Sequence, residues 1–195
     1  RGRRSNSIGR EILVLLDGIR LNDPVTGGVF SQERDLSLLN VKQVEVIRGP
    51  GSALYGANAF SAVINIILDT GDNFAELKYG SFDAAEGAVT ASRQGVNWDV
   101  TALLSHYKDN GDSYDAFYEF FGVLERTQDP TRRFDGYVKA RYEGTTVIAR
   151  RNERSDISFV VAGGQGNENQ RHRVENKSFR LTHDVDVNQL STSWF

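Results

Sequence analysis

The residues of this sequence that could support chemistry are a glycine-rich turn and three histidines. A phosphate-binding loop places a lysine beside serine or threonine after its last glycine. The run Gly56-Ala57-Asn58, which follows Gly49-Pro50-Gly51, contains neither. His106, His172 and His183 are dispersed, and none has a carboxylate arranged beside a nucleophile. The sequence therefore predicts no catalytic residues, no metal site, no cofactor and no enzyme.

An acidic and aromatic stretch at residues 109–125 is a candidate ligand site. Carboxylates are calcium ligands, and aromatic rings in a loop can contact a ligand. A loop that packs its own aromatic side chains is an equally good interpretation. The candidate ligand contacts in this stretch are Tyr114, Phe117, Tyr118 and Phe121.

Composition restricts the class of protein. With 195 residues, 39% hydrophobic and 25% charged, the chain is long enough for one large domain or two small ones. The net charge of −3, with both signs scattered, predicts no nucleic-acid partner. No apolar run approaches the roughly 18 residues of a membrane-spanning helix, whereas a spanning strand needs only about 9 to 11 residues. The absence of cysteine excludes disulfides and thiolate metal sites.

Up to about residue 68, short apolar segments alternate with turn residues. Residues 12–16 run into the turn dipeptide Asp17-Gly18, and residues 19–21 resume the strand, which predicts a small hairpin. Residues 44–47 and 62–67 are rich in β-branched residues and predict two further strands. Because these segments are almost continuously apolar, we expect strands that are buried on both faces.

After residue 72 the apolar residues alternate with polar ones. Two segments, 96–107 and 134–143, each have one apolar and one mostly polar face. The same pattern recurs at 179–187, with His183 as a misfit on the apolar side, and more weakly at 75–79 and 85–91. Tight turns at 94–95 and 143–145 contrast with polar connections at 108–133 and 154–176. This arrangement is typical of outer-membrane barrels, although a soluble sheet with one solvated face shows the same alternation.

The segment from Glu45 to Ile67 carries the most specific pattern of the chain. A strand ends in Ile47-Arg48-Gly49-Pro50, a turn leads through Leu54-Tyr55-Gly56, and a strand closes with Val63-Ile64-Asn65-Ile66-Ile67. This order resembles the plug signature of TonB-dependent outer-membrane receptors, and the Asp17-Gly18 hairpin resembles the one that precedes it. The residues that carry the resemblance are Glu45, Arg48, Gly49, Pro50, Gly51, Leu54, Tyr55, Gly56 and Asn65. Ser61-Ala62 stands where family members commonly have two glycines.

Physical chemistry assigns roles to several signature residues. Gly49, Pro50 and Gly51 predict a sharp reversal after a buried strand, and Gly56 permits a second one. Tyr55 can bury its ring while its hydroxyl finds a partner. Arg48 is a poor candidate for unpaired burial, so we expect it to pair with a carboxylate. The resemblance implies that this carboxylate lies on the barrel wall or elsewhere in the plug.

The resemblance implies a mostly β fold in two parts. Residues 1–70 would be the C-terminal part of a plug, a small mixed sheet with short helices. Residues 71–195 would be the first six or seven strands of a 22-stranded barrel, which this chain leaves incomplete. The first residues lack the apolar core of a signal peptide, so we expect the natural start to be missing. The segment that TonB grips is likewise expected to lie outside this chain.

The implied function is active transport across the outer membrane of a Gram-negative bacterium. Such a receptor binds a scarce ligand on the extracellular side and imports it with energy supplied through TonB. Iron–siderophore complexes are the commonest ligand class of the family, beside cobalamin, haem and carbohydrates. Outer-membrane lipid would surround the strands. The alternative function is that of a soluble β-rich binding or adhesion module.

Overall fold

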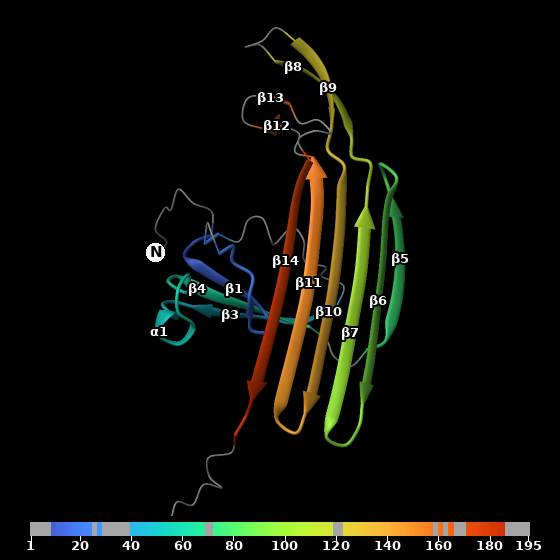
Figure 1. The fold of residues 1–195 in the computed structure, drawn as a ribbon. Coiled ribbons are helices and arrows are strands. Elements are labelled where there is room, and N and C mark those ends of the chain that lie inside the picture. Colours follow the sequence, from blue (N-terminus) through green and yellow to red (C-terminus); the bar gives the residue numbers. More distant parts are fainter. Residues whose placement is uncertain are drawn as a thin grey trace, which may run out of the picture.

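The protein is described by a computed structural model in which strands predominate. The described residues are 9–24, 27–28, 40–68, 72–118, 123–157, 160–161, 164–165 and 171–185. The strands of a small N-terminal sheet run toward one face of a larger six-stranded sheet (Figure 1). The prediction of a mostly β chain that combines a mixed sheet with an antiparallel one is confirmed. None of the described helices is long and apolar enough to span a membrane.

The N-terminal sheet has four strands in the order β2-β1-β4-β3. Strand β1 pairs in parallel with β4, while β2 and β3 pair antiparallel with their neighbours, so the sheet is mixed. Its elements are β1 (Ile12–Leu16), β2 (Ile19–Arg20), β3 (Val41–Arg48), α1 (Ser52–Tyr55) and β4 (Ala62–Leu68). Leu13, Leu15, Ala59 and Val63 form a core of its own.

The six-stranded sheet is antiparallel throughout, in the order β14-β11-β10-β7-β6-β5. Its strands are β5 (Phe74–Gly80), β6 (Ala84–Gln94), β7 (Trp98–Lys108), β10 (Thr131–Tyr142), β11 (Thr145–Ile157) and β14 (Arg171–His183). Tight turns join β6 to β7 and β10 to β11 at one end (Figure 1). The second turn uses Glu143 and Gly144, both with positive φ, as the right-handed twist of a hairpin requires. Among the described strands the sheet is open, with β5 and β14 at its edges.

The two faces of the six-stranded sheet differ as the alternation predicts. One face, here called the inner face, carries Thr101, Leu103, Asp135, Tyr137 and Arg150, which are buried against the N-terminal sheet or against one another. The opposite, outer face exposes large apolar side chains: Leu77, Val89, Val100, Leu104, Val138, Phe179 and Leu181. The N-terminal sheet therefore lies on the polar side of the larger sheet.

A second core joins the two sheets. From the N-terminal sheet it takes Val14, Leu16, Ile19, Leu21 and Leu68, and from the inner face it takes Leu103, Tyr137 and Ile148. These last three are the apolar interruptions of an otherwise polar face. Their burial against the N-terminal sheet explains why the alternation is broken at these positions.

The prediction that every N-terminal strand is buried on both faces is wrong for β3. This strand is an edge strand, and it exposes Val44 at 53% and Val46 at 55%. Only β1, in the middle of the sheet, is buried along most of its length. The apolar composition of β3 is therefore not explained by contacts among the described residues.

The predicted polar connections are partly strand. Strands β8 (Ser113–Tyr118) and β9 (Val123–Gln128) form a hairpin within 108–133, and β12 (Val160–Val161) pairs with β13 (Gly164–Gln165) within 154–176. Strand β14 begins at Arg171, within the second predicted connection. Cross-strand ion pairs such as Arg173–Glu153 at 2.7 Å hold these polar strand ends, so apolar alternation cannot reveal them. Strand β14 ends at His183, and Val187 lies outside the described residues.

Candidate functional site

The candidate site is the tip of the β1–β2 hairpin, where the N-terminal sheet touches the inner face. Asp17 and Gly18 have φ values of 45° and 76°, so the hairpin turns tightly and projects its tip. The Asp17 carboxylate accepts a hydrogen bond from the Tyr137 hydroxyl and lies 3.5 Å from Lys139 Nζ. The Asp17 side chain is only 4% exposed and that of Lys139 is 14% exposed. A buried carboxylate is thus compensated by a cation and a hydroxyl from β10.

A second strand of the larger sheet forms a hydrogen bond with the backbone of the same tip. Arg180, in β14, donates from Nη1 to the Asp17 carbonyl oxygen at 2.9 Å. Its guanidinium occupies the space in which a side chain of residue 18 would lie, so any Cβ there would collide with it. The positive φ therefore favours glycine at position 18, and any side chain there would displace the Arg180 guanidinium from the Asp17 carbonyl.

The tip is tied to the signature strands by one asparagine side chain. Asn65 Oδ1 accepts a hydrogen bond from the Gly18 amide at 3.2 Å, and Asn65 Nδ2 donates to Glu45 Oε2 at 3.1 Å. The Asp17 amide donates to the Ile66 carbonyl at 2.8 Å. The structure thus brings together four of the residues singled out from the sequence: Asp17, Gly18, Glu45 and Asn65.

The other signature residues form a separate turn that supports the sheet. Gly49 and Gly56 have φ values of 107° and 76°, and a Cβ at Gly51 would lie 3.1 Å from Val63. The Gly51 carbonyl accepts hydrogen bonds from the amides of Leu54 and Tyr55. Leu54 is 87% exposed and Tyr55 is 39% exposed, so the possible burial of the Tyr55 ring is not seen here. Pro50 belongs to the same turn, which lies apart from the hairpin tip at the other end of β4.

Arg48 does not reach the hairpin tip. It is exposed at the end of β3, and the described residues give it no ion pair. The reversal at Gly49 therefore follows an exposed strand rather than the buried strand predicted. The expected carboxylate partner of Arg48 remains a prediction.

A buried ion pair lies beside the hairpin tip on the inner face. Arg150 donates from Nε and Nη2 to the two carboxylate oxygens of Asp135, at 3.0 and 2.7 Å. The side chains are 6% and 7% exposed. A cavity of about 260 Å³ separates Arg150 from the β2 side of the hairpin, with Arg20, Asn22 and Ser178 among its other lining residues. The paired geometry fixes β10 against β11 and leaves the guanidinium at the boundary of this cavity.

The partners of Asp17 on the larger sheet were not predicted from the sequence. Tyr137 could have been noticed, because it is an apolar interruption of the polar face, like Leu103 and Ile148. Lys139 and Arg180 carry no such signal, since charged residues are expected throughout that face. Only the register of β10 and β14 against the hairpin selects them.

The other candidate residues do not extend the site. Tyr114, Phe117 and Tyr118 fall in β8, whose side chains are not described, and Phe121 lies outside the described residues. His106 lies on β7, and His172 and His183 lie at opposite ends of β14. No group of three potential metal ligands occurs in the part of the chain that the structure describes.

Comparison with known proteins gives a family match for the N-terminal part of the chain and similarity to relatives over longer parts. Residues 1–63 match the family model of the TonB-dependent Receptor Plug Domain. The vitamin B12 transporter BtuB of Vibrio vulnificus is 32% identical over 113 residues, which are 56% of this chain and 18% of that protein. The corresponding protein of Photobacterium profundum is 32% identical over 107 residues, or 51% of this chain and 17% of that protein.

Solved structures share the fold. A mutant of the ferric enterobactin receptor PfeA from Pseudomonas aeruginosa superimposes with a TM-score of 0.58 at 18% identity, covering 91% of this chain and 31% of that one. The copper transporter OprC gives a TM-score of 0.51 at 15% identity, covering 89% of this chain and 27% of that one. The chain thus spans less than a third of the length of each relative. Taken together, these matches support the identification of this chain as part of a TonB-dependent receptor, and residues 1–63 carry the match to the plug domain of that family.

Proposed function

We propose that this chain is part of an outer-membrane receptor that binds a scarce extracellular ligand and imports it with energy supplied through TonB. Residues 1–70 form the C-terminal part of the plug, and residues 71–195 form the first strands of a 22-stranded barrel. The observation that carries the proposal is the Asp17 contact. It fixes the plug hairpin to the polar face of a sheet whose other face carries a band of exposed apolar side chains.

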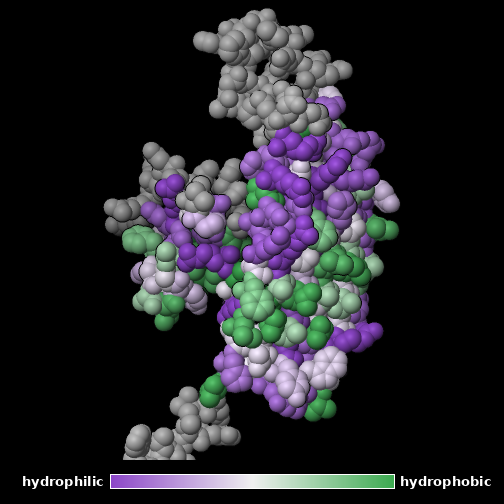
Figure 2. Space-filling view, in the orientation of Figure 1, coloured by the Kyte–Doolittle hydropathy of each residue, from purple (hydrophilic) through white to green (hydrophobic). Residues whose placement is uncertain are grey.

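The outer face of β10 supports a position in lipid. Along this face, Phe134 and Tyr142 bracket Gly136, Val138 and Ala140, and Trp98 of β7 lies opposite Tyr142. Eight residues of strand rise about 27 Å, or about 20 Å for a strand tilted by about 40°. This is close to the roughly 25 Å of an outward apolar band flanked by aromatic residues. Figure 2 shows the hydrophobic band on the sheet below a hydrophilic zone.

The hairpin tip is the contact that holds the plug in the pore. It consists of a buried ion pair, two side-chain hydrogen bonds and a small shared core, and no covalent bond. A pull that separates Asp17 from Lys139 exposes both charges to water, which then solvates them. The contact is therefore strong at rest and can be released by a mechanical pull.

The exposed side of β3 is consistent with a barrel whose remaining strands surround the plug. In this proposal the remaining barrel strands cover Val44 and Val46, and one of them supplies the carboxylate that pairs with Arg48. The signature turn from Gly49 to Gly56 positions α1 toward that side. TonB acts through an N-terminal segment outside this chain.

Two cargo classes are proposed. Iron–siderophore complexes are the first, in keeping with the structural similarity to the ferric enterobactin receptor. Cobalamin is the second, because the relatives with 32% sequence identity are vitamin B12 transporters. The site for either ligand would lie at the end of the barrel that carries the β8–β9 hairpin.

Uptake by cells tests the proposal. The full-length polypeptide that contains this chain is expressed in a Gram-negative strain that lacks its own siderophore and cobalamin receptors, with and without TonB. Radiolabelled ferric siderophores and radiolabelled cobalamin are supplied separately. We expect uptake of one class that disappears without TonB, and extraction of the protein only with detergent. Uptake that persists without TonB, or extraction into buffer alone, would overturn the proposal and favour a soluble binding module.

A further inference from the structure

The outer face of the six-stranded sheet carries a row of cations directly above its apolar band. Arg132 of β10 lies opposite Lys108 of β7 on one side and opposite Ser155 of β11 on the other. Ser155 in turn lies opposite Arg173 of β14. The row thus crosses four adjacent strands with three cations, one hydroxyl and no carboxylate. Neighbouring strands are about 4.8 Å apart, so the three charges fall within about 15 Å.

This arrangement is electrostatically unfavourable without an anion. Like charges directly opposite each other across an antiparallel pair destabilise the pairing, and Lys108 and Arg132 are such a pair. Both are exposed, and the described residues provide neither with a carboxylate partner. Glu153, one row lower, pairs with Arg173 at 2.7 Å and with Arg151 at 3.3 Å. Glu153 therefore partly neutralises Arg173, the third cation of the row, whereas Lys108 and Arg132 receive no carboxylate from the described residues.

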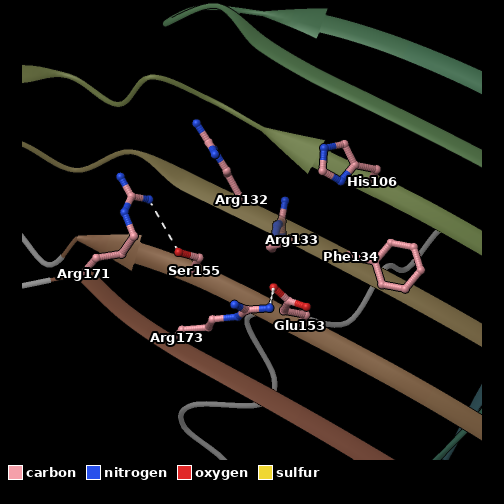
Figure 3. A pocket seen from close by; sticks show the side chains of 8 residues that line it. All are labelled: His106, Arg132, Arg133, Phe134, Glu153, Ser155, Arg171 and Arg173. Carbon is pink, nitrogen blue, oxygen red and sulfur yellow. Dashed lines mark hydrogen bonds and ion pairs between the residues drawn. The ribbon is translucent and has the colours of Figure 1, made fainter. Parts of the chain in front are cut away.

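A cavity of about 480 Å³ opens on this surface (Figure 3). Arg132, Arg171 and Arg173 line it from two strands, β10 and β14. Ser155 and Glu153 of β11 lie between them, and the Phe134 ring lies on the side nearer the apolar band. Arg171 Nη1 donates to Ser155 Oγ at 3.5 Å, a long and weak hydrogen bond that a stronger acceptor would displace. Guanidinium groups arranged around a hydroxyl are well suited to bind phosphate oxygens.

We propose that this cationic row, Lys108, Arg132 and Arg173 with Ser155, binds the phosphorylated headgroup of an outer-leaflet lipid. The same face presents Leu104, Val138 and Phe179 below the row, so one amphiphile satisfies both parts: its phosphate contacts the cations and its acyl chains lie along the apolar side chains. A lipid can contact both the cations and the apolar side chains below them, whereas free phosphate can contact only the cations. The inference rests on the membrane position proposed above and adds a specific lipid contact to it.

The test uses the full-length receptor that contains this chain, purified in detergent and shown by heat-modifiable gel migration to be folded. It is titrated separately with bis-phosphorylated lipid A, dephosphorylated lipid A and inorganic phosphate, and bound ligand is measured by native mass spectrometry. Lys108→Gln/Arg132→Gln removes two cations of the row. Lys42→Gln/Lys78→Gln removes two cations elsewhere and is the matched control. Arg132→Lys keeps the charge.

We expect the Lys108→Gln/Arg132→Gln receptor to bind lipid A about 30-fold more weakly, the product of about a fivefold contribution from each cation near an anionic surface. The control and Arg132→Lys should stay within about threefold of the unmodified receptor. Dephosphorylated lipid A and inorganic phosphate should both bind weakly. Equal affinity of the double variant for lipid A, or equal binding of inorganic phosphate, would overturn the inference. Those results leave detergent-dependent extraction and TonB-dependent uptake intact, so a failure here is distinguishable from a failure of the proposed function.

Discussion

The two faces of the six-stranded sheet make different kinds of contact, although the same strands form both faces. The inner face binds one particular partner, the hairpin tip, through Tyr137, Lys139 and Arg180. The outer face repeats one kind of side chain over a band and meets no partner among the described residues. A specific contact depends on a few buried polar atoms, whereas a contact with a fluid apolar medium depends only on average character. Substitutions should therefore act locally and strongly on the inner face, and through polarity alone within the apolar band of the outer face.

The largest expected effect is that of Asp17→Ala on the inner face. This change leaves Lys139, whose side chain is 14% exposed, without its carboxylate, and removes the acceptor of the Tyr137 hydroxyl. Breaking a buried pair typically costs about 3 to 5 kcal/mol. We expect a loosened plug and greater passive entry of large antibiotics in cells that produce the full-length receptor. Asp17→Asn keeps a hydrogen-bond acceptor and should have an intermediate effect, and equal antibiotic sensitivity at equal expression would refute the role of this contact.

On the outer face, Val138→Arg should cost about 2 to 4 kcal/mol when the protein unfolds from a lipid bilayer. Val138 is 45% exposed on this face, so an arginine at this position would place a charge in hydrocarbon. Chemical unfolding of the full-length protein in vesicles measures the effect, with Val138→Leu as the apolar control. A surface substitution in water usually changes stability by less than about 0.5 kcal/mol. A cost that small for Val138→Arg would show that this face is solvated.

Gly18→Ala is a smaller perturbation of the inner face. It strains a residue with φ of 76° and drives a methyl group into the Arg180 guanidinium. Each such strain costs about 1 to 3 kcal/mol. Arg180→Ala removes the collision but also the hydrogen bond to the Asp17 carbonyl, so its own cost must be subtracted. We expect Gly18→Ala to lower the unfolding free energy less in the Arg180→Ala background than in the unmodified protein. An equal cost in both backgrounds would place the whole cost in the backbone.

Arg48→Ala should have the smallest effect of the four. Arg48 is exposed at the end of β3, and its partner is proposed to lie on wall strands outside the described residues. We expect a modest rise in passive permeability to large antibiotics, below that of Asp17→Ala in the same assay. A larger rise than with Asp17→Ala would mean that the main clamp lies on the β3 side of the plug.

The sequence by itself determined the elements and their polarity. Apolar segments rich in β-branched residues specified β1 and β4, and period-two alternation specified which side chains of β7 and β10 share a face, because successive side chains of a strand point to opposite sides. Motif resemblance selected Asp17, Gly18, Glu45 and Asn65, which the structure joins in one hydrogen-bonded group. Local pattern is sufficient for such properties, since each depends on neighbours in the chain.

The tertiary structure alone decided which distant residues contact one another. Lys139 and Arg180 contact Asp17 from 122 and 163 residues away along the chain, and nothing in their local sequence distinguishes them from other charged residues of the inner face. The exposure of β3 and the extension of β11 and β14 into polar sequence likewise depend on pairing across strands. Register and docking are set by contacts between distant segments, and a one-residue slip would turn every side chain to the opposite face.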